Sequence, residues 1–299
     1  MITQENTQYW KACYQCDSKN LVPFYKNKQI YKCSDCNFIF YKNIPSLTEL
    51  NEVYSNYSRE EYITDISRQK ITSEFKNFIY IHNIKNVLDI ACGECYFLDI
   101  LREINPGLNL YATEHETAKQ RILNKGYEFI EGDFFPKTDI KFDLIIFTEA
   151  IEHINDVTEF LEHAYELLNP KGFIYITTPN FSSLERRIMG EKWGMIVPPE
   201  HLSYFTVSTL NEALTKVKFK KIFNRSENIS IYRIVEFFNN HLRSKNQTSK
   251  TKHSPQAISD RMQKASSKIF ALGLIKNLIN YILRVLNLGS GLKALYQKD

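Results

Sequence analysis

The stretch VLDIACGECYFL, residues 87–98, decides the fold of this chain. Its apolar run ends at Asp89, small residues follow around Gly93, and a helical pattern begins at Tyr96. This order predicts a strand, a tight turn and a helix, the opening unit of a nucleotide-binding α/β sheet. Small side chains let the turn approach a ligand closely, and the N–H groups at a helix start attract a carboxylate or phosphate. We therefore expect a ligand at this turn.

Strand and helix patterns alternate regularly from this unit onward. The apolar periodicity predicts strands over residues 86–90, 108–112, 128–130, 142–147 and 173–177. It predicts the intervening helices over residues 96–104, 118–125 and 156–168, the last of which stops at the sequence Pro170, Lys171, Gly172. Such alternation is typical of a doubly wound parallel sheet, whose ligands bind where the strands end.

Polar residues stand at those strand ends. Asp89 ends the first strand, Glu114 follows the second, Asp133 follows the third, and residues 149–153 and 178–180 follow the fourth and fifth. A carboxylate after the second strand is placed to accept both hydroxyls of a ribose. The turn lacks the three glycines of a dinucleotide site, and Asp89 would repel a diphosphate. The pattern favours a ligand that has a ribose and no diphosphate.

Six cysteines form two groups. Sixteen residues separate the first pair from the second in the set Cys13, Cys16, Cys33 and Cys36. Two Cys-x-x-Cys pairs at this spacing are typical of a structural zinc ribbon, in which bound Zn²⁺ supplies folding energy. Free thiols or two disulfides are the alternative, and a reducing compartment disfavours the disulfides. We interpret residues 30–41 as a strand flanking the metal, and Cys92 and Cys95 as small residues that fill space in the turn.

Length, composition and charge are those of a folded protein. The chain has 299 residues, of which 43% are hydrophobic and 24% are charged, enough for a large core. Its net charge of +4 is too mild to indicate a nucleic-acid partner. No secretory signal pattern begins the sequence, so we expect a cytoplasmic protein.

The order of these motifs resembles that of a known protein family. In chain order, the motifs that resemble those of class I S-adenosylmethionine-dependent methyltransferases are VLDIACGECYFL, Glu114, Gly132 with Asp133, EAIEHI and LLNPKGFIYITTPN. One group of small-molecule methyltransferases carries an N-terminal four-cysteine zinc segment and, after the core, a phrase like PPEHLSYFT. This chain resembles that group, because it has the four cysteines and has PPEHLSYFT at residues 198–206. The resemblance covers about residues 10–225. It implies an α/β fold with a Rossmann-like seven-stranded sheet whose last strand is antiparallel.

The resemblance also implies site residues. It assigns S-adenosylmethionine contacts to Asp89, Ala91, Cys92, Gly93, Glu114, Asp133, Phe134 and Glu149, with the amino-acid part at residues 89–93, the ribose at Glu114 and the adenine near Asp133. The family's turn usually has glycine where this chain has Ala91 and Cys95. Structural Zn²⁺ is assigned to Cys13, Cys16, Cys33 and Cys36.

Two histidines are candidates for catalysis. Methyl transfer to a hydroxyl requires alignment of the reactants and removal of a proton. His153 and His201 each follow a glutamate and are expected at the strand ends, where an imidazole has a suitable pKa. His153 has an alternative role as a helix-start residue that binds backbone. A divalent metal held by Glu and His is a third interpretation, although the sequence shows no third ligand at a spacing typical of such a site.

The ends of the chain complete the predicted domains. These are a zinc ribbon (1–45), a helical lead-in (46–82) with Ser46 and Glu49 as a helix cap, the core (83–228), a helical insertion (229–289) and a final core strand (290–299). Within the core we predict a helix over 206–217 and a strand over 219–224, and in the last segment a strand over 291–297.

The insertion has two features of its own. Residues 241–253 are basic, and residues 269–288 form an amphipathic helix that Lys276 and Arg284 make unsuitable for spanning a membrane. Contact with a membrane surface is one interpretation of this helix. Packing on the core or on a second subunit is the other, and the oligomeric state is not readable from the sequence.

Two functions from different classes follow. The first is methyl transfer to a small-molecule acceptor, with a hydroxyl of a sugar or of a lipid-linked polysaccharide intermediate suggested by the resemblance. The second is an RNA-binding or RNA-methylating protein that grips its target with the zinc ribbon and the basic run. The mild charge favours the first.

Overall fold

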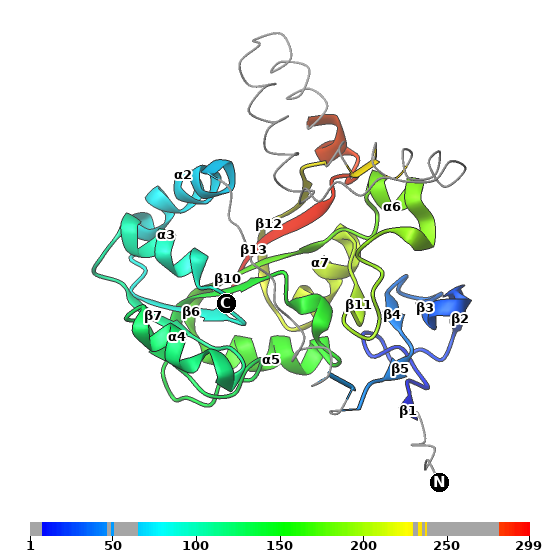
Figure 1. Cartoon of the computed structure of the whole chain (residues 1–299), viewed down its shortest axis with the longest axis horizontal. Coiled ribbons are helices and arrows are strands. Elements are labelled where there is room, and N and C mark those ends of the chain that lie inside the picture. The colour runs from blue at the N-terminus through cyan, green and yellow to red at the C-terminus, as the bar shows by residue number, and fades with distance from the viewer. Residues whose placement is uncertain (1–7, 47–48, 51–64, 230–232, 235–236, 238–280) are drawn as a thin grey trace, which may run out of the picture.

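We describe a computed structural model of the chain, which places residues 8–46, 49–50, 65–229, 233–234, 237 and 281–299 (Figure 1). The basic run at 241–253, most of the predicted helix that Ser46 begins, and residues 269–280 of the amphipathic helix lie outside these ranges. Ser46 and Glu49 do form the predicted cap, because the Ser46 N–H reaches Glu49 Oε2 at 2.8 Å and the Glu49 N–H reaches Ser46 Oγ at 3.2 Å.

A seven-stranded sheet forms the centre of the molecule, in the order β12-β13-β10-β9-β6-β7-β8. Its strands are β6 (Asn86–Ile90), β7 (Asn109–Ala112), β8 (Glu128–Phe129), β9 (Phe142–Thr148), β10 (Leu168–Pro179), β12 (Lys220–Glu227) and β13 (Gly291–Gln297). β13 runs antiparallel to both of its neighbours, β10 and β12. The predicted fold class and the antiparallel last strand are confirmed.

Helices cover both faces of the sheet because successive strand side chains alternate between two apolar clusters. Val87, Leu144 and Tyr175 pack with α2 (Asp65–Ile81), α3 (Tyr96–Ile104) and α4 (Lys119–Asn124). Leu88 and Ile145 pack on the other face with α5 (Val157–Leu167) and α7 (Val207–Lys216). Figure 1 shows α2 and α3 on one side of β6 and β10 and α5 on the other. The carboxyl ends of β6, β7, β9 and β10 therefore share one edge of the sheet.

Helix boundaries follow local capping. Asp156 caps α5 by accepting from the Glu159 N–H at 3.0 Å, and Thr206 caps α7 in a reciprocal box with Thr209. α5 ends at Leu167, one residue before the predicted end, and residues 170–172 lie inside β10. This strand begins at Leu168, earlier than residue 173, because Leu168 already pairs with Phe142 of β9. Single helical turns occur at Lys26–Lys28, Glu116–Ala118, Ile151–His153 and Gly190–Lys192, and α6 covers Leu184–Met189.

A second, four-stranded sheet contains the cysteine segment, in the order β11-β4-β3-β2. Its strands are β2 (Leu21–Tyr25), β3 (Ile30–Cys33), β4 (Ile39–Tyr41) and β11 (Ser203–Tyr204), and a separate pair joins β1 (Gln8–Tyr9) to β5 (Asn43–Ile44). The prediction of one strand over 30–41 is wrong. A tight turn, in which the Cys33 N–H reaches the Phe38 carbonyl at 2.8 Å, divides that segment into a hairpin.

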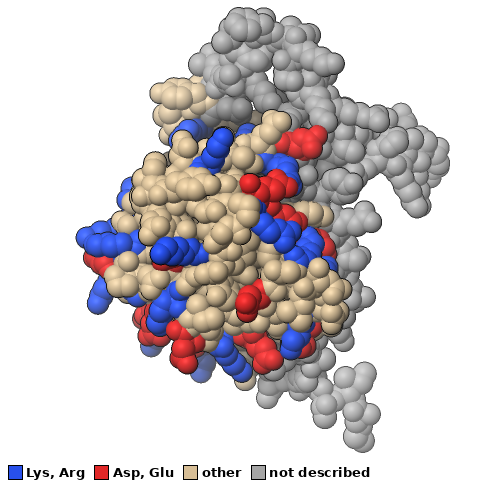
Figure 2. Space-filling model, turned by 90° about the vertical axis from the view of Figure 1, so that its left-hand side faces the viewer, with Lys and Arg blue, Asp and Glu red and all other residues tan. Residues whose placement is uncertain are grey.

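Charged side chains of both signs are mixed on the side of the molecule that carries α2 and α3 (Figure 2). No extended patch of one sign appears on that face, in keeping with the small net charge. Among the residues that the structure describes, no helix has both the length and the apolar character needed to cross a membrane.

Candidate cofactor and acceptor site

The turn after β6 has an unusual backbone. Ala91, Gly93 and Cys95 all have left-handed φ angles, of 55°, 52° and 57°. This conformation costs a residue other than glycine about 1–2 kcal/mol. Hydrogen bonds hold it in place, since the Ala91 N–H reaches Thr113 Oγ1 at 3.3 Å and the Cys92 N–H reaches the Thr113 carbonyl at 3.0 Å. The turn therefore keeps its shape although two of the family's glycines are replaced.

Glu114 binds the same turn from the end of β7. Its Oε2 accepts from the Gly93 N–H at 2.9 Å, and its Oε1 accepts from the His115 N–H at 3.1 Å. Each carboxylate oxygen has a second lone pair, so both can still accept a hydroxyl. The predicted ribose residue thus lies beside the predicted amino-acid turn. Thr113, which the sequence reasoning missed, belongs to this site as the anchor of the turn, and its position directly after β7 is the only signal for it in the sequence.

Asp133, Phe134 and Glu149 follow β8 and β9. Asp133 and Glu149 also have left-handed φ angles, of 46° and 49°, and the Glu149 N–H reaches the Thr177 carbonyl at 2.9 Å. The Phe134 ring meets the Phe147 ring edge-on, with centroids 6.3 Å apart. Burial, and then the nearby charge of Glu114, raises the pKa of Asp133 from 3.8 to about 6. Backbone strain and a perturbed carboxyl therefore gather at one sheet edge, as they do at functional sites.

His153 and His201 lie against each other, with ring centroids 4.8 Å apart and ring planes at 88°. The Nδ1 of His153 is 2.8 Å from the Glu200 carbonyl, and the Nδ1 of His201 is 2.8 Å from the Met195 carbonyl. A carbonyl only accepts, so both rings carry a hydrogen on Nδ1 and, when neutral, have a basic Nε2. Both imidazoles are buried, with residue exposures of 8% and 2%. The contact of His153 Nδ1 with the Glu200 carbonyl is thus a bond to backbone and, at the same time, a bond that positions the imidazole as a base.

Acidic and hydroxyl groups surround the two histidines. Ligand atoms of Glu152, His153 and His201 all lie within 4.8 Å of one another. The Thr178 hydroxyl donates to Glu152 Oε2 at 2.8 Å, and Glu200 Oε1 lies 3.9 Å from His201 Nε2. The sequence indicated each histidine separately. Their contact follows from the Leu202 N–H, which reaches the Glu152 carbonyl at 2.7 Å and so holds the residue after His201 against the residue before His153.

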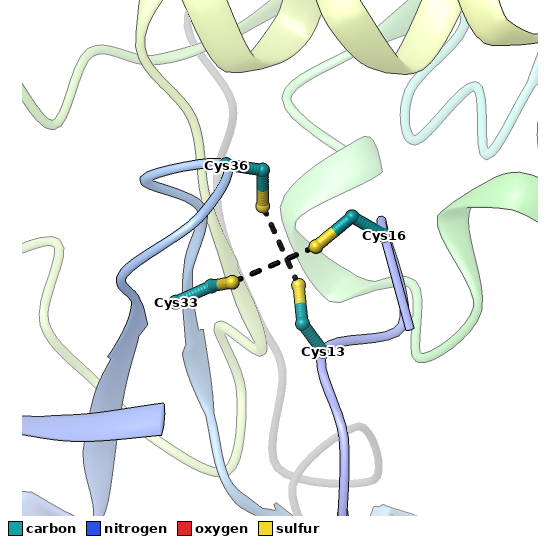
Figure 3. Close-up of side chains that lie close together, drawn as sticks. All are labelled: Cys13, Cys16, Cys33 and Cys36. Carbon is teal, nitrogen blue, oxygen red and sulfur yellow. Dashed lines mark hydrogen bonds between the residues drawn. The ribbon is translucent and has the colours of Figure 1, made fainter. Parts of the chain in front are cut away.

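The four cysteine sulfurs converge, as Figure 3 shows. Cys13 Sγ is 3.6 Å from Cys36 Sγ, and Cys16 Sγ is 3.5 Å from Cys33 Sγ. Sulfurs bound at about 2.3 Å to a tetrahedral zinc ion would be about 3.8 Å apart, so the cluster has suitable dimensions. Burial raises the pKa of Cys13 to about 12, so a thiolate there needs a neighbouring cation.

The cysteine segment packs directly on the main domain. The Tyr14 hydroxyl lies 2.6 Å from the Ser203 hydroxyl, and the Lys28 ammonium donates to the Ile196 carbonyl at 2.9 Å. Cys13, Cys33 and Phe38 belong to the same apolar cluster as α5 and α7. The segment therefore supports the loop that carries His201.

Comparison with known proteins now gives the family. The sequence matches the family described as "Methyltransferase domain" over residues 60–222, which is more than half of the chain. The chain belongs to this methyltransferase family. A ubiquinone biosynthesis O-methyltransferase of Chelativorans sp. (strain BNC1) is 26% identical over 137 residues, covering 39% of this chain and 54% of that protein. The mitochondrial ubiquinone biosynthesis O-methyltransferase of Dictyostelium discoideum is 28% identical over 186 residues, covering 50% and 57%.

The chain spans little more than half the length of those curated relatives. Among solved structures it resembles coclaurine N-methyltransferase bound to N-methylheliamine and SAH, with a TM-score of 0.50, 13% identity and coverage of 81% of this chain and 74% of that chain. At such low identity the likeness concerns the fold alone. That fold is the class I methyltransferase fold which the motif order predicted.

The donor set of this sheet edge fits S-adenosylmethionine. Asp89, Glu114 and Glu149 give this edge an acidic character that suits a cationic ligand, and Glu114 suits a ribose. The N-terminus of α3 suits the carboxylate of the amino-acid part.

Replacement of Asp133 by Asn should remove a pH-dependent loss of stability. Because the pKa of Asp133 is raised from 3.8 to about 6, the folded protein holds this proton more tightly than the unfolded chain does. Its contribution to stability is complete below about pH 4 and is lost as the pH rises through about 6. Asn tolerates the left-handed backbone, so Asp133→Asn changes mainly the charge.

The measurement is urea unfolding from pH 4 to pH 7 of the wild type, Asp133→Asn and the exposed control Asp139→Asn. Relative to the wild type, Asp133→Asn should gain stability as the pH rises, and Asp139→Asn should not. Parallel pH profiles for the wild type and Asp133→Asn would contradict the raised pKa.

Proposed function

We propose that this chain transfers the methyl group of S-adenosylmethionine to a hydroxyl of a small molecule. The observation that carries the proposal is the shared sheet edge: the turn bound by Glu114 and the buried pair of His153 and His201 lie at the ends of neighbouring strands. Cofactor recognition and proton removal are thereby available in one place. Membership of the methyltransferase family supports the reaction class.

The cofactor residues divide by chemistry. Residues 89–93 and the start of α3 would hold the amino-acid part, and the oxygens of Glu114 would accept the ribose hydroxyls. Asp133 and Phe134 would meet the adenine, one by hydrogen bonding and the other by ring contact. Glu149, held by the Thr177 carbonyl, would lie between the cofactor and the histidines. S-adenosylmethionine supplies an electrophilic methyl group on a sulfonium when bound.

His201 and His153 would then remove the proton of the acceptor hydroxyl. An acceptor hydroxyl loses its proton as its oxygen attacks, and a positioned imidazole contributes by taking that proton. The Met195 and Glu200 carbonyls fix the hydrogens on Nδ1 and so direct Nε2 to the task. A proton gained at His201 Nε2 would face the Glu200 carboxylate 3.9 Å away, which favours the imidazolium.

Oxygen is the acceptor atom that the relatives support, because the curated relatives are named O-methyltransferases. Within that class we propose a sugar hydroxyl, free or on a lipid-linked polysaccharide intermediate, as the motif resemblance suggests. Peripheral contact with a membrane through residues 269–288 belongs to the same proposal, as does a cytoplasmic location. Of that segment, the described residues Tyr281, Ile282, Val285 and Leu286 are exposed.

A structural zinc ion is the second part of the proposal. The sulfur separations of 3.5 and 3.6 Å support Zn²⁺ at Cys13, Cys16, Cys33 and Cys36. The metal would fix the hairpin of β3 and β4, and β4 pairs with β11, which begins two residues after His201. We infer that zinc acts on catalysis by positioning His201.

Replacing Glu114 by Ala should weaken S-adenosylmethionine binding about tenfold to a hundredfold, because two hydrogen bonds of about 1 kcal/mol each are lost. Isothermal titration of wild type, Glu114→Ala and the exposed neighbour control Glu116→Ala measures this. Glu116→Ala should bind as the wild type does. A wild-type chain that binds no S-adenosylmethionine would overturn the proposed function, and unchanged binding by Glu114→Ala would overturn the ribose assignment.

Replacing His201 by Gln should lower kcat by about 10²–10⁴ with little change in the dissociation constant of S-adenosylmethionine. His153→Gln is expected to act in the same direction, and the exposed control His82→Gln should be neutral. The assay follows transfer of radiolabelled methyl groups to a panel of nucleotide sugars and polyprenyl-linked sugars. Full turnover by both His201→Gln and His153→Gln would exclude the histidine base.

Purified chain should contain one zinc ion, and Cys33→Ser should lose it. Because the metal is proposed to position His201, Cys33→Ser should reduce kcat more than the affinity for S-adenosylmethionine. Atomic absorption, titration calorimetry and the methyl-transfer assay measure the three quantities, with the exposed turn residue Ser34→Ala as the control. Purified wild type that carries no zinc under reducing conditions would refute the assignment.

A further inference from the structure

The cofactor turn contains a pair of buried thiols. Cys92 Sγ and Cys95 Sγ lie 3.0 Å apart, on either side of Gly93 and Glu94. Both are free thiols, and their residues are 8% and 0% exposed. The Cys95 N–H reaches the Cys92 carbonyl at 2.8 Å, which closes a tight turn. Such a turn keeps its end Cα atoms within about 7 Å, near the range that a disulfide spans.

Conformation does not explain why residue 95 is a cysteine. Its φ of 57° is the left-handed conformation. Glycine adopts this conformation without cost, whereas in a cysteine it costs about 1–2 kcal/mol. Glycine would also keep the turn small. A side chain that is retained at an unfavourable backbone position is one for which a chemical role should be sought.

The surroundings make the two thiols chemically unequal. The hydrogen bond from Cys92, with the positive charges of Lys125 and Arg121, lowers the pKa of Cys95. The hydrogen bond to Cys95, burial and the charge of Asp89 raise the pKa of Cys92. Two cysteines two residues apart, with the sulfurs in contact and the second at the start of α3 beside Lys125 and Arg121, resemble the surroundings in which a Cys-x-x-Cys pair is reactive.

We propose that Cys92 and Cys95 are a site of oxidative modification, at which a hydroperoxide forms a disulfide that weakens cofactor binding. The inference rests on the proposed function, because it concerns the same turn. In the first step one thiolate attacks the peroxide, the O–O bond breaks, and a sulfenic acid and hydroxide form; the hydroxide takes up the proton that the thiol had released and leaves as water. The second thiol attacks that sulfur, its proton leaves with the hydroxyl as water, and the S–S bond forms. Two thiols and one hydrogen peroxide thus give one disulfide and two waters.

The turn transmits this change to the cofactor residues. Disulfide formation draws the sulfurs from 3.0 Å to about 2.0 Å apart, and the residues between them must adjust. The Gly93 N–H is bound to Glu114, and the Gly93 carbonyl accepts from Arg121 at 2.9 Å. A displacement of about 1 Å at a positioned site can cost two orders of magnitude in function. Oxidation is therefore expected to disturb the contact between the turn and Glu114.

The test uses the full chain, reduced and then treated with hydrogen peroxide. Trypsin releases residues 86–102 as one peptide that contains Cys92 and Cys95 alone, whereas the four proposed zinc ligands fall in peptides 12–19 and 33–42. After alkylation, peptide 86–102 should be lighter by two hydrogens than the unmodified dithiol. Oxidised protein should bind S-adenosylmethionine about tenfold more weakly or worse, and dithiothreitol should restore the affinity. Saturating S-adenosylmethionine should slow disulfide formation, since the linkage is reciprocal.

The decisive control is the variant Cys95→Gly. For each variant, the dissociation constant of S-adenosylmethionine after oxidation is divided by the constant before oxidation. The ratio should be near one in Cys95→Gly, while zinc content, measured in parallel, stays constant. A complete disulfide with unchanged affinity, or an unoxidised peptide 86–102, would overturn the proposal. An equal affinity loss in Cys95→Gly would also overturn it. Absence of binding by the reduced wild type would instead defeat the proposed function.

Discussion

The backbone of Leu202 joins the two parts of this protein at the point where its chemistry is proposed to occur. Its N–H donates to the Glu152 carbonyl at 2.7 Å, and its carbonyl accepts from the Tyr41 N–H at 2.8 Å. His153 follows the first partner and His201 precedes Leu202, so these bonds bring the two imidazoles together. Tyr41 belongs to β4, which continues the cysteine hairpin. The cysteine hairpin, the pairing of β4 with β11 and the histidine geometry are therefore parts of one structural arrangement.

In the turn after β6, hydrogen bonds offset the cost of a left-handed backbone. Two residues other than glycine adopt left-handed angles there, and Thr113 and Glu114, which follow the neighbouring strand β7, compensate by binding the turn's N–H groups. Glu114 supports the turn through the Gly93 N–H, and in the proposed function it also presents its oxygens to the ribose. Because the support of the turn and the proposed ribose recognition use one carboxylate, a change in the turn would reach the proposed binding site directly.

Much of the fold was readable from the sequence, for reasons that particular elements make clear. β6, α3 and β13 begin and end where their apolar patterns predict, because local periodicity and tertiary packing agree. The break in the predicted strand over 30–41 was not placed, because the turn between β3 and β4 is set by hydrogen bonding around the cysteines and not by glycine or proline. The contacts between His153 and His201, and between β11 and β4, join residues far apart in the chain, and a single sequence carries no signal for such pairs.

The central claim is that the edge formed by β6, β7, β9 and β10 binds S-adenosylmethionine beside the two histidines. A crystal structure of the chain with S-adenosylhomocysteine tests this most directly. The account predicts the ribose hydroxyls within hydrogen-bond distance of Glu114, the amino-acid part over residues 89–93, and the thioether sulfur on the side of His201. Product bound away from the turn, or with its sulfur directed away from His153 and His201, would contradict it.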